Sequence, residues 1–291
     1  MGVAFPGQGV DPTDVARVLD EHAADPLIDQ LRALVGPGDW ASLDLNDTRV
    51  GQPCVYSASV LSAAGAGDAL PSGDAEILVF GHSLGELAAV AHAGACSPSA
   101  GLDLVARRAA LGHAVNERRP GSMIVVMRLD EHDVEWVRRT VSDETHGVLE
   151  LAVVNGTGQF VLSGDAASAE RALDVIADVG GVGRALPIGG AYHSPVMAEI
   201  VAPYRDALRD TLTRDPRCPV VSCTSGAVLR TKEDLVEALA RALVLPVRWL
   251  DALHGAVAAG AVEAVDVGPS RTLANLARFS PVLPFRSLRP D

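Results

Sequence analysis

The stretch ILVFGHSLGELAAVA, residues 77–91, decides the fold. Its first four residues are typical of a buried strand, and its alanine-rich end is typical of a helix. Between them, Gly81 and Gly85 flank Ser83 in a turn so tight that the apical residue is forced into a strained backbone conformation. The serine hydroxyl then stands at the amino end of a helix, where backbone N–H groups and the helix dipole stabilise an anion. The stretch therefore predicts a nucleophile elbow and an enzyme that forms an ester on Ser83.

Outward from this turn, apolar runs alternate with helical segments along most of the chain. Strands are expected at 3–5, 76–80, 220–224 and 262–267. Helices are expected at 11–36, 52–66, 97–116, 195–213, 232–244 and 247–259, with a Gly/Pro/Asp loop at 67–74 and a final helix after 268–270. Strands that alternate with helices predict an α/β fold with a mostly parallel sheet covered by helices on both faces.

Residues 119–188 change this pattern. The expected elements are strands at 123–127, 149–154, 160–163 and 184–188, with helices at 131–141 and 167–179. The order β-α-β-β-α-β is that of a ferredoxin-like α+β subdomain. Because it is self-contained, we expect residues 119–188 to be inserted into a large catalytic α/β subdomain made of residues 1–118 and 189–291.

The composition narrows the class of protein. Of 291 residues, 48% are hydrophobic, enough for a large core, and the formal net charge is −13. Such an acidic chain argues against nucleic acid and gives no reason to expect binding to an anionic membrane. It has no signal-peptide pattern and no apolar run of about 18 residues, so we expect no membrane span and a cytoplasmic location.

The four cysteines predict neither a metal site nor a redox centre. Cys54, Cys96, Cys218 and Cys223 are scattered, and no pair has CxxC spacing. Free thiols in a reducing compartment are therefore expected. No metal and no redox cofactor is implied.

A serine nucleophile needs a base, and the chain has eight histidines. His193 lies in the glycine-rich loop 189–195 between an expected strand and an expected helix, a place where α/β proteins put catalytic groups. By spacing alone, a structural histidine fits this position about as well as a base. His82 adjoins Ser83 but is expected to point away from it.

Several separated segments together resemble the malonyl-CoA:acyl carrier protein transacylase family, which includes the acyltransferases of fatty acid and polyketide synthesis. The matching segments, in order, are 5–9 (FPGQG), 81–86 (GHSLGE), Arg108, 191–194 (AYHS), 246–249 (PVRW) and 267–269 (VGP). The similarity covers nearly the whole chain, including the inserted segment.

The resemblance implies a Ser–His dyad. Ser83 would attack a thioester carbonyl, and His193 would take its proton and later return it to the leaving thiol. The N–H groups of Gln8 and Leu84 would form the oxyanion hole. In the family a backbone carbonyl orients the histidine, usually from a glutamine, and Ala242 stands at that position here.

The resemblance also implies the kind of acyl group. The arginine matching Arg108 binds the free carboxylate of malonyl in a two-point salt bridge, although most helix arginines are merely solvated. Tyr192 and Leu84 resemble members that use malonyl, whereas Gly190 is neither the histidine nor the tyrosine often found there. One methyl group is worth only ~1–3 kcal/mol of discrimination, so a substituted malonyl stays open beside malonyl itself.

Other residues are candidates for the pocket. Asn155 and Gln159 lie in the turn 154–159, and similar residues of the family lie near the cleft. An ordinary hairpin turn rich in Asn and Gly explains them equally well. We group His82 with Asn155 and Tyr192 as pocket residues.

The expected partners are malonyl-CoA or a related acyl-CoA and an acyl carrier protein, with coenzyme A thioester as substrate. Because carrier proteins are usually acidic, docking should use a local basic patch despite the negative net charge. The candidates for this patch are Arg118, Arg119, Arg138, Arg139 and Arg271.

Two alternatives compete with a transferase. The first is a hydrolase, either a general α/β-hydrolase that uses Asp251 and His254 or a proofreading acyl hydrolase of the same family, against which Arg108 argues. The second is a scaffold without catalysis, against which the presence of Ser83 and His193 argues.

Overall fold

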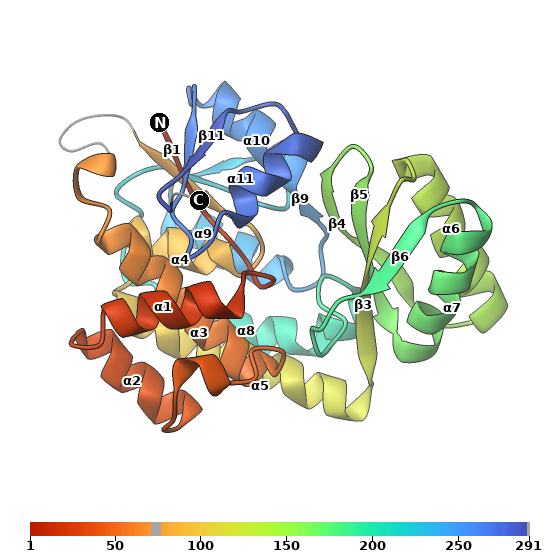
Figure 1. The fold of residues 1–291 in the computed structure, drawn as a ribbon, viewed down its shortest axis with the longest axis horizontal. Helices are drawn as coiled ribbons and strands as arrows, with labels where there is room; N and C mark the ends of the chain where they lie inside the picture. The colour runs from red at the N-terminus through yellow and green to blue at the C-terminus, as the bar shows by residue number, and fades with distance from the viewer. Residues whose placement is uncertain (71–76, 290–291) are drawn as a thin grey trace.

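Two sheets organise the chain (Figure 1). The computed structural model describes residues 1–70 and 77–289. The larger sheet has the order β11-β10-β1-β2-β7-β8, and all neighbours are parallel except the antiparallel pair β7 and β8. Its strands are β1 (Gly2–Phe5), β2 (Leu78–Gly81), β7 (Val220–Val221), β8 (Val228–Leu229), β10 (Ala264–Asp266) and β11 (Phe285–Ser287). The expected α/β class with a helix-flanked, mostly parallel sheet is confirmed.

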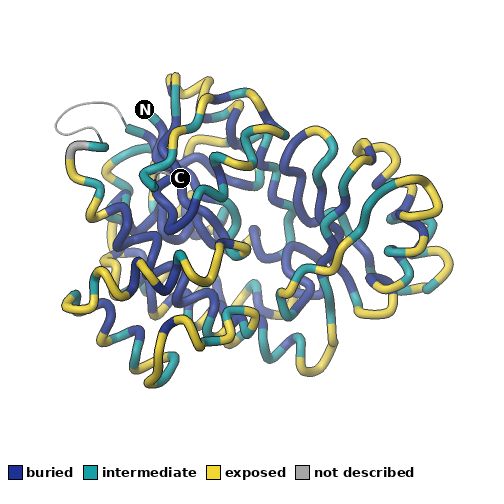
Figure 2. Tube along the Cα trace, in the orientation of Figure 1, coloured by how far each residue is buried: buried dark blue, intermediate teal, exposed yellow. Residues whose placement is uncertain are grey.

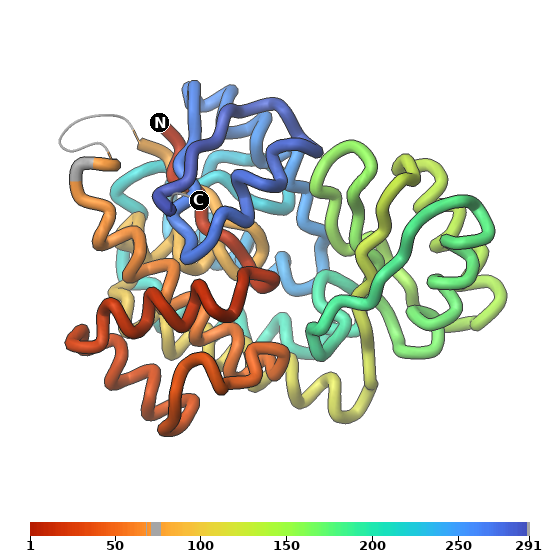
Figure 3. Tube along the Cα trace, in the orientation of Figure 1, coloured from red at the N-terminus to blue at the C-terminus, as the bar shows by residue number. Residues whose placement is uncertain are grey.

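The centre of this sheet positions the site. Strands β1 and β2 are buried along their whole length, as parallel strands covered on both faces should be. Their register pairs Phe5 with Gly81, so both strands end at the same edge. Figure 3 shows β1, from the beginning of the chain, beside the late strand β10, its parallel partner. The loop after Phe5 and the turn after Gly81 are thereby brought together.

Helices cover the larger sheet. They are α1 (Pro12–Glu21), α2 (Pro26–Val35), α3 (Thr48–Ala64), α4 (Gly85–His92), α5 (Pro98–Arg118), α8 (Val201–Thr211), α9 (Lys232–Arg241), α10 (Trp249–Ala258) and α11 (Thr272–Leu276). Helix α3 packs against α1, α2, α4 and α5. No helix in the described ranges has the length and apolar character needed to cross a bilayer.

Several expected boundaries were wrong. The helix expected at 11–36 is two helices, because Asp25 caps α2 through the N–H of Leu27 (2.8 Å) and Pro26 disfavours helical geometry in the residue before it. The first six residues of the helix expected at 195–213 form a 3₁₀ segment, Pro195–Ile200. The short strands β8 and β11 had no sequence signal. Residues 71–74 of the expected loop and residue 76 of the expected strand lie outside the described residues.

The smaller sheet has the order β6-β3-β5-β4-β9. Its elements are β3 (Gly121–Met127), α6 (Glu131–Thr145), β4 (Leu149–Gly156), β5 (Gln159–Asp165), α7 (Ala166–Asp178), β6 (Val182–Ala185) and β9 (Val247–Arg248). The first four strands of that order pair antiparallel, and β9 joins β4 in parallel. Strand β9 comes from beyond residue 188, so the smaller sheet draws on both parts of the chain. The division at residues 118 and 188 stays a prediction.

The smaller sheet separates two cores. In β3 the side chains alternate, so that Ile124 and Val126 pack with helices α6 and α7, whereas Met123 and Val125 face the larger core. Figure 2 shows buried segments on both sides of the molecule. One face of the smaller sheet is thus free to form a wall of a cleft.

We expect the Gly85→Ala substitution to lower the free energy of unfolding by ~1–3 kcal/mol, despite alanine's better helix propensity. A Cβ at position 85 would clash with the carbonyl oxygen of Phe5, a backbone atom at the centre of the sheet. Urea denaturation measures the change. The control is Gly189→Ala, where the nearest atom would lie 3.6 Å from the new Cβ. Equal unfolding midpoints for Gly85→Ala and the parent would contradict this packing argument.

Candidate active site

Ser83 occupies the turn between β2 and α4 in the left-handed region, with φ of 53°. This conformation is uncommon for a residue with a side chain and costs about 1–3 kcal/mol, so its surroundings must hold it. The His82 N–H donates to Phe5 O (2.9 Å), and the Glu86 N–H donates to Ser83 O (3.0 Å). Backbone hydrogen bonds on both sides therefore hold Ser83 in place.

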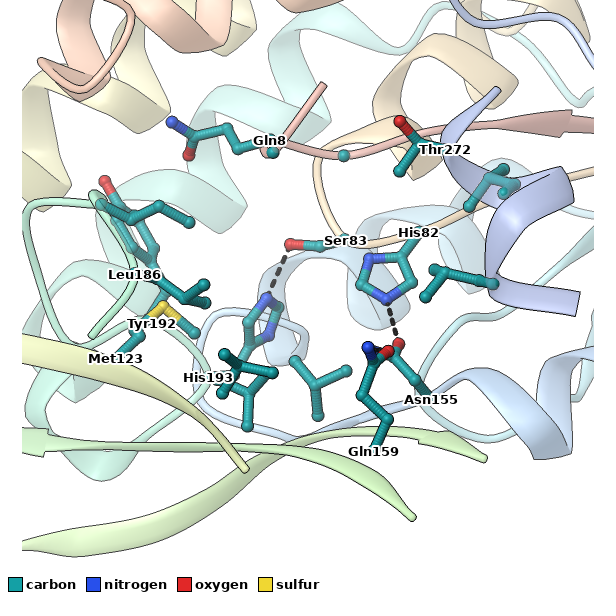
Figure 4. A pocket seen from close by; sticks show the side chains of 18 of the residues that line it. Gln8, His82, Ser83, Met123, Asn155, Gln159, Leu186, Tyr192, His193 and Thr272 are labelled. Atoms are coloured by element: carbon teal, nitrogen blue, oxygen red, sulfur yellow. Dashed lines mark hydrogen bonds between the residues drawn. The ribbon is translucent and has the colours of Figure 1, made fainter. Parts of the chain in front are cut away.

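The hydroxyl of Ser83 meets the imidazole of His193 (Figure 4). Ser83 Oγ lies 2.7 Å from His193 Nε2. On the other side of the ring, Nδ1 lies 2.7 Å from Ala242 O and 3.1 Å from Leu245 O. Because a carbonyl only accepts, Nδ1 must carry the proton, which leaves the Nε2 lone pair facing the hydroxyl. The ring is oriented for the serine to donate to it.

The surroundings keep this ring neutral. Burial, and next the positive charge of Arg108, lower the pKa of His193 to about 3. The two backbone carbonyls act in the opposite direction but are outweighed. At neutral pH the imidazole is therefore a free base, ready to accept a proton.

Arg108, on α5, is a buried cation whose hydrogen-bond partner is neutral. Its side chain is only 7% exposed, and Nη1 donates to Gln52 Oε1 (2.7 Å). No carboxylate of residues 1–70 or 77–289 lies within salt-bridge distance of the guanidinium. The guanidinium carbon also lies 5.0 Å from the centre of the Tyr192 ring. A buried cation without an anionic partner in its cleft can bind an anionic ligand.

Gln52 was missed by the sequence reasoning. It is fully buried in α3, and its Nε2 has no hydrogen-bond partner within the described part of the chain. The same holds for the hydroxyl of Tyr192. The signal that could have found Gln52 is a large amide flanked on both sides by small and apolar residues, VG before it and PCV after it.

The ring of His82 lines the cleft that also contains Ser83, as the grouping of His82 with the pocket residues predicts, and its hydrogen bond is to Asn155 and not to the serine. His82 Nε2 lies 2.8 Å from Asn155 Oδ1, and Asn155 Nδ2 donates to Gln159 Oε1 (3.0 Å) (Figure 4). Burial lowers the pKa of His82. The hairpin of β4 and β5 thus contributes two amide side chains to the cleft and is more than a connecting turn.

Gln8 and Leu84 present backbone N–H groups near the serine. Gln8 lies in the loop after β1 and lines the cleft, and Leu84 precedes the first residue of α4. Neither N–H donates to another backbone or side-chain group among the residues that the structure covers. Both are available to a ligand.

One cleft of about 260 Å³ is lined by most of these residues: Gln8, His82, Ser83, Arg108, Asn155, Gln159, Tyr192 and His193. The smaller sheet and the segment after it supply an apolar wall together with the amides of Asn155 and Gln159, and the larger part of the molecule supplies the other polar groups described above. The apolar residues of that wall are Met123, Val125, Val153, Val161, Leu186 and Ile188. No cluster of three His, Cys, Asp or Glu side chains suited to a metal ion occurs in the two described ranges.

Residues 31–278 match the family described as "Acyl transferase domain". The chain is 30% identical over 289 residues to a malonyl CoA-acyl carrier protein transacylase of Bacillus subtilis (strain 168), covering 94% of this chain and 88% of the relative. It is 29% identical to the polyketide biosynthesis malonyl CoA-acyl carrier protein transacylase PksC of the same organism, covering 94% of both. The crystal structure of an acyl-carrier-protein S-malonyltransferase from Burkholderia pseudomallei 1710b superposes with a TM-score of 0.85 at 26% identity, over 99% of this chain and 95% of that one.

The chain belongs to the acyl transferase domain family and is an acyltransferase. More narrowly, it is a member of the group of malonyl CoA-acyl carrier protein transacylases, which confirms the resemblance found in the sequence.

We expect the imidazole of His193 to titrate far below the ordinary histidine range. As the pH falls through about 6.5, the unfolded chain takes up a proton at this residue and the folded chain does not, so the free energy of unfolding falls with the pH. Nuclear magnetic resonance of ring-labelled histidine, with the His193→Gln variant to assign the signal, measures the folded-state pKa. A midpoint at or above 6.5 would contradict the burial argument.

Proposed function

We propose that this chain transfers a malonyl group from coenzyme A to the phosphopantetheine thiol of an acyl carrier protein, through an ester on Ser83. The observation that carries the proposal is the contact of Ser83 Oγ with the unprotonated nitrogen of His193, in a cleft that also holds the Arg108 guanidinium. The turn 81–85 would be the nucleophile elbow. The smaller sheet with α6 and α7 would be the ferredoxin-like subdomain, since its elements follow the β-α-β-β-α-β order.

In the first half-reaction Ser83 Oγ attacks the thioester carbonyl and its proton passes to His193 Nε2. The negative charge on the carbonyl oxygen is stabilised by the N–H groups of Gln8 and Leu84. The carbon–sulfur bond then breaks, and His193 returns the proton to the thiolate of coenzyme A. In the second half-reaction the carrier thiol gives its proton to His193 Nε2 and attacks the carbonyl of the ester. The bond to Ser83 Oγ then breaks, and His193 returns the proton to Ser83. The residues named supply every group that these steps require, so we infer that no metal or redox cofactor takes part.

Arg108 would bind the free carboxylate of the malonyl group. The guanidinium has donors left beyond the one that meets Gln52, and a carboxylate accepts two parallel N–H bonds from it. The unpartnered Nε2 of Gln52 supplies one more donor close by. An acyl group without a carboxylate would leave these buried donors unpaired.

Tyr192 supports malonyl over bulkier units. Its buried ring lies against the guanidinium, where it takes up space beside the acyl group. Gly190 has φ of 117°, and a Cβ there would come within 3.3 Å of the Tyr192 ring. A histidine or tyrosine at position 190 would therefore be strained and would press on that ring. The glycine that departs from the family pattern lets Tyr192 keep its place.

The carrier docking patch stays a prediction. Arg118 pairs with Glu199, and both Arg138 and Arg139 pair with Glu135, so three of the five candidate arginines already have acidic neighbours. Arg271 precedes Thr272, which lines the cleft, and is the candidate nearest to it in sequence. The cytoplasmic location likewise stays a prediction.

The general hydrolase alternative finds no support. The carboxylate of Asp251 accepts from Arg248 Nε (3.2 Å), and His254 is exposed on α10. Neither residue lines the cleft that contains Ser83. A proofreading hydrolase of the same family would use the same dyad, so the fate of the ester distinguishes it from a transferase.

The test is a single-turnover reaction with malonyl-CoA, followed by intact-protein mass spectrometry. We expect one malonyl group on the parent chain and none on Ser83→Ala, because that variant lacks the attacking oxygen. The exposed Ser99→Ala is the control and should react as the parent does. Added holo carrier protein should remove the ester and gain the group. Rapid loss of the ester to water without carrier would contradict the transferase.

We expect Arg108→Ala to lower kcat/KM for malonyl-CoA by roughly 10- to 150-fold, the equivalent of ~1.5–3 kcal/mol for a charged hydrogen bond. Acetyl-CoA, which has no free carboxylate, should not lose rate in the same variant. Arg107→Ala, an exposed arginine next to it on α5, is the matched control. Steady-state kinetics with malonyl-CoA and acetyl-CoA give the change in kcat/KM for each donor. An equal fall for both donors would show that Arg108 does not bind the carboxylate.

A further inference from the structure

Glu86 is a buried carboxyl group that the reaction described above does not use. It lies in the first turn of α4, three residues after Ser83, and is only 1% exposed. Oε1 accepts the backbone N–H of Cys223 (3.0 Å), and Oε2 accepts the thiol of the same residue (3.2 Å). Both oxygens are therefore directed at one residue, Cys223. It follows strand β7, which is the neighbour of β2 in the larger sheet.

Burying this carboxyl group costs free energy, because the charged form loses its contacts with water. Burial raises the pKa of Glu86 to about 7, and the hydrogen bonds from Cys223, together with the more distant charge of Arg108, only partly oppose this. A solvated residue at this position would avoid the penalty. The two hydrogen bonds from Cys223 are the interactions that offset this cost.

Cys223 connects this helix to the segment that holds the histidine. Its carbonyl oxygen accepts the backbone N–H of Arg248 (2.7 Å). Arg248 directly follows the stretch 242–247, whose carbonyls at Ala242 and Leu245 accept from His193 Nδ1. A short path thus runs from the helix of the nucleophile, through Glu86 and Cys223, to the carbonyls that orient the base.

Cys223 also lies directly against the nucleophile turn. Burial and Glu86 raise the pKa of its thiol well above the usual range, and a hydrogen bond from the backbone of Ser83 acts against this shift. The thiol is fully buried. Glu86, three residues after Ser83, thus holds Cys223 close to the turn in which Ser83 has φ of 53°.

We propose that Glu86 and Cys223 form a brace that fixes the position of Ser83 relative to His193, so that Glu86 is a positioning residue for acyl transfer. The inference rests on the proposed function only in taking Ser83 as the nucleophile. What matters is an acceptor oxygen that reaches the N–H of Cys223. Without this oxygen, Cys223 no longer connects the start of α4 to the segment 242–248. The 2.7 Å contact between the Ser83 hydroxyl and the His193 imidazole then lengthens.

The test compares two variants of Glu86, which distinguish the position of the acceptor oxygen from the negative charge of the side chain. Glu86→Gln keeps an acceptor oxygen at the same distance and removes the charge, whereas Glu86→Asp keeps the charge and withdraws the oxygens by one methylene. The readout is the rate at which a fluorophosphonate probe labels Ser83, measured by intact mass. This reaction needs an activated serine but no particular acyl donor.

We expect Glu86→Asp to be labelled about 10- to 100-fold more slowly than the parent chain, as a misplacement of about 1 Å commonly costs. Glu86→Gln should stay within about threefold of the parent chain. The opposite order would overturn the brace, because it would make the negative charge of Glu86, and not the reach of its oxygens, the property that counts. Labelling of both variants at the parent rate would also overturn it.

A pair of cysteine variants tests the other side of the brace. Cys223→Ala removes the thiol but keeps the backbone N–H, so its labelling should slow by less than that of Glu86→Asp. Cys54→Ala, an equal truncation of a buried thiol in α3, is the control and should be labelled at the parent rate. Slowing of Cys54→Ala as large as that of Cys223→Ala would assign the effect to general core loosening and overturn the proposal for the thiol.

Kinetics with malonyl-CoA distinguish positioning from binding. In Glu86→Asp the rate constant for forming the ester should fall while the half-saturating concentration of malonyl-CoA changes by less than about threefold, because Arg108 and Gln52 are untouched. A rise in that concentration with an unchanged rate constant would overturn the proposal. If the parent chain reacts with the probe but not with malonyl-CoA, the proposed function is refuted. The labelling rates of the variants then still test the brace.

Discussion

The close approach of two glycines to backbone is the constraint on which the site depends. Gly85 leaves no room for a Cβ against the carbonyl of Phe5, and Gly81 leaves none against the backbone at residues 85 and 86. Helix α4 can therefore begin directly over the ends of β1 and β2, and Ser83 is driven into the left-handed region. The same approach brings the Gln8 loop beside the serine, so the proposed nucleophile and one of the N–H groups proposed for the oxyanion share a cause.

Burial sets the chemistry of the groups around this turn. It lowers the pKa of His193 to about 3 and raises that of Glu86 to about 7, because in each case it disfavours the charged form. Arg108 brings the positive charge of a guanidinium into the same surroundings. The cleft therefore contains a neutral base and a fixed cation without an anion of its own among the described residues, an arrangement suited to a substrate that carries the missing charge.

Local patterns in the sequence predicted the local parts of the site, the family resemblance supplied the distant pairing of Ser83 with His193 and Ala242, and other distant contacts were missed. The turn around Ser83 and the order of elements in 119–188 follow from short-range periodicity and small residues, so they could be found. Gln52 meets Arg108 across 56 positions, and Cys223 meets Glu86 across 137, and no spacing rule connects such pairs. Strands of two residues, such as β9, exist only because a neighbour pairs with them. The orientation of His82 depends on Asn155, a residue of the other sheet.

The proposed substrate would change the base that acts on it. Arg108 is the second cause of the lowered pKa of His193, after burial. Its effect on the ring should weaken when an anion binds the guanidinium. A malonyl carboxylate bound to the guanidinium would neutralise much of that field, so the pKa of the imidazole would rise, while burial, the larger cause, would still hold it below its ordinary value. A stronger base would then meet the hydroxyl only when the correct acyl group is in place. An acyl group without a carboxylate would leave the base weak, so the same arginine would select the substrate both by binding it and through the reactivity of Ser83.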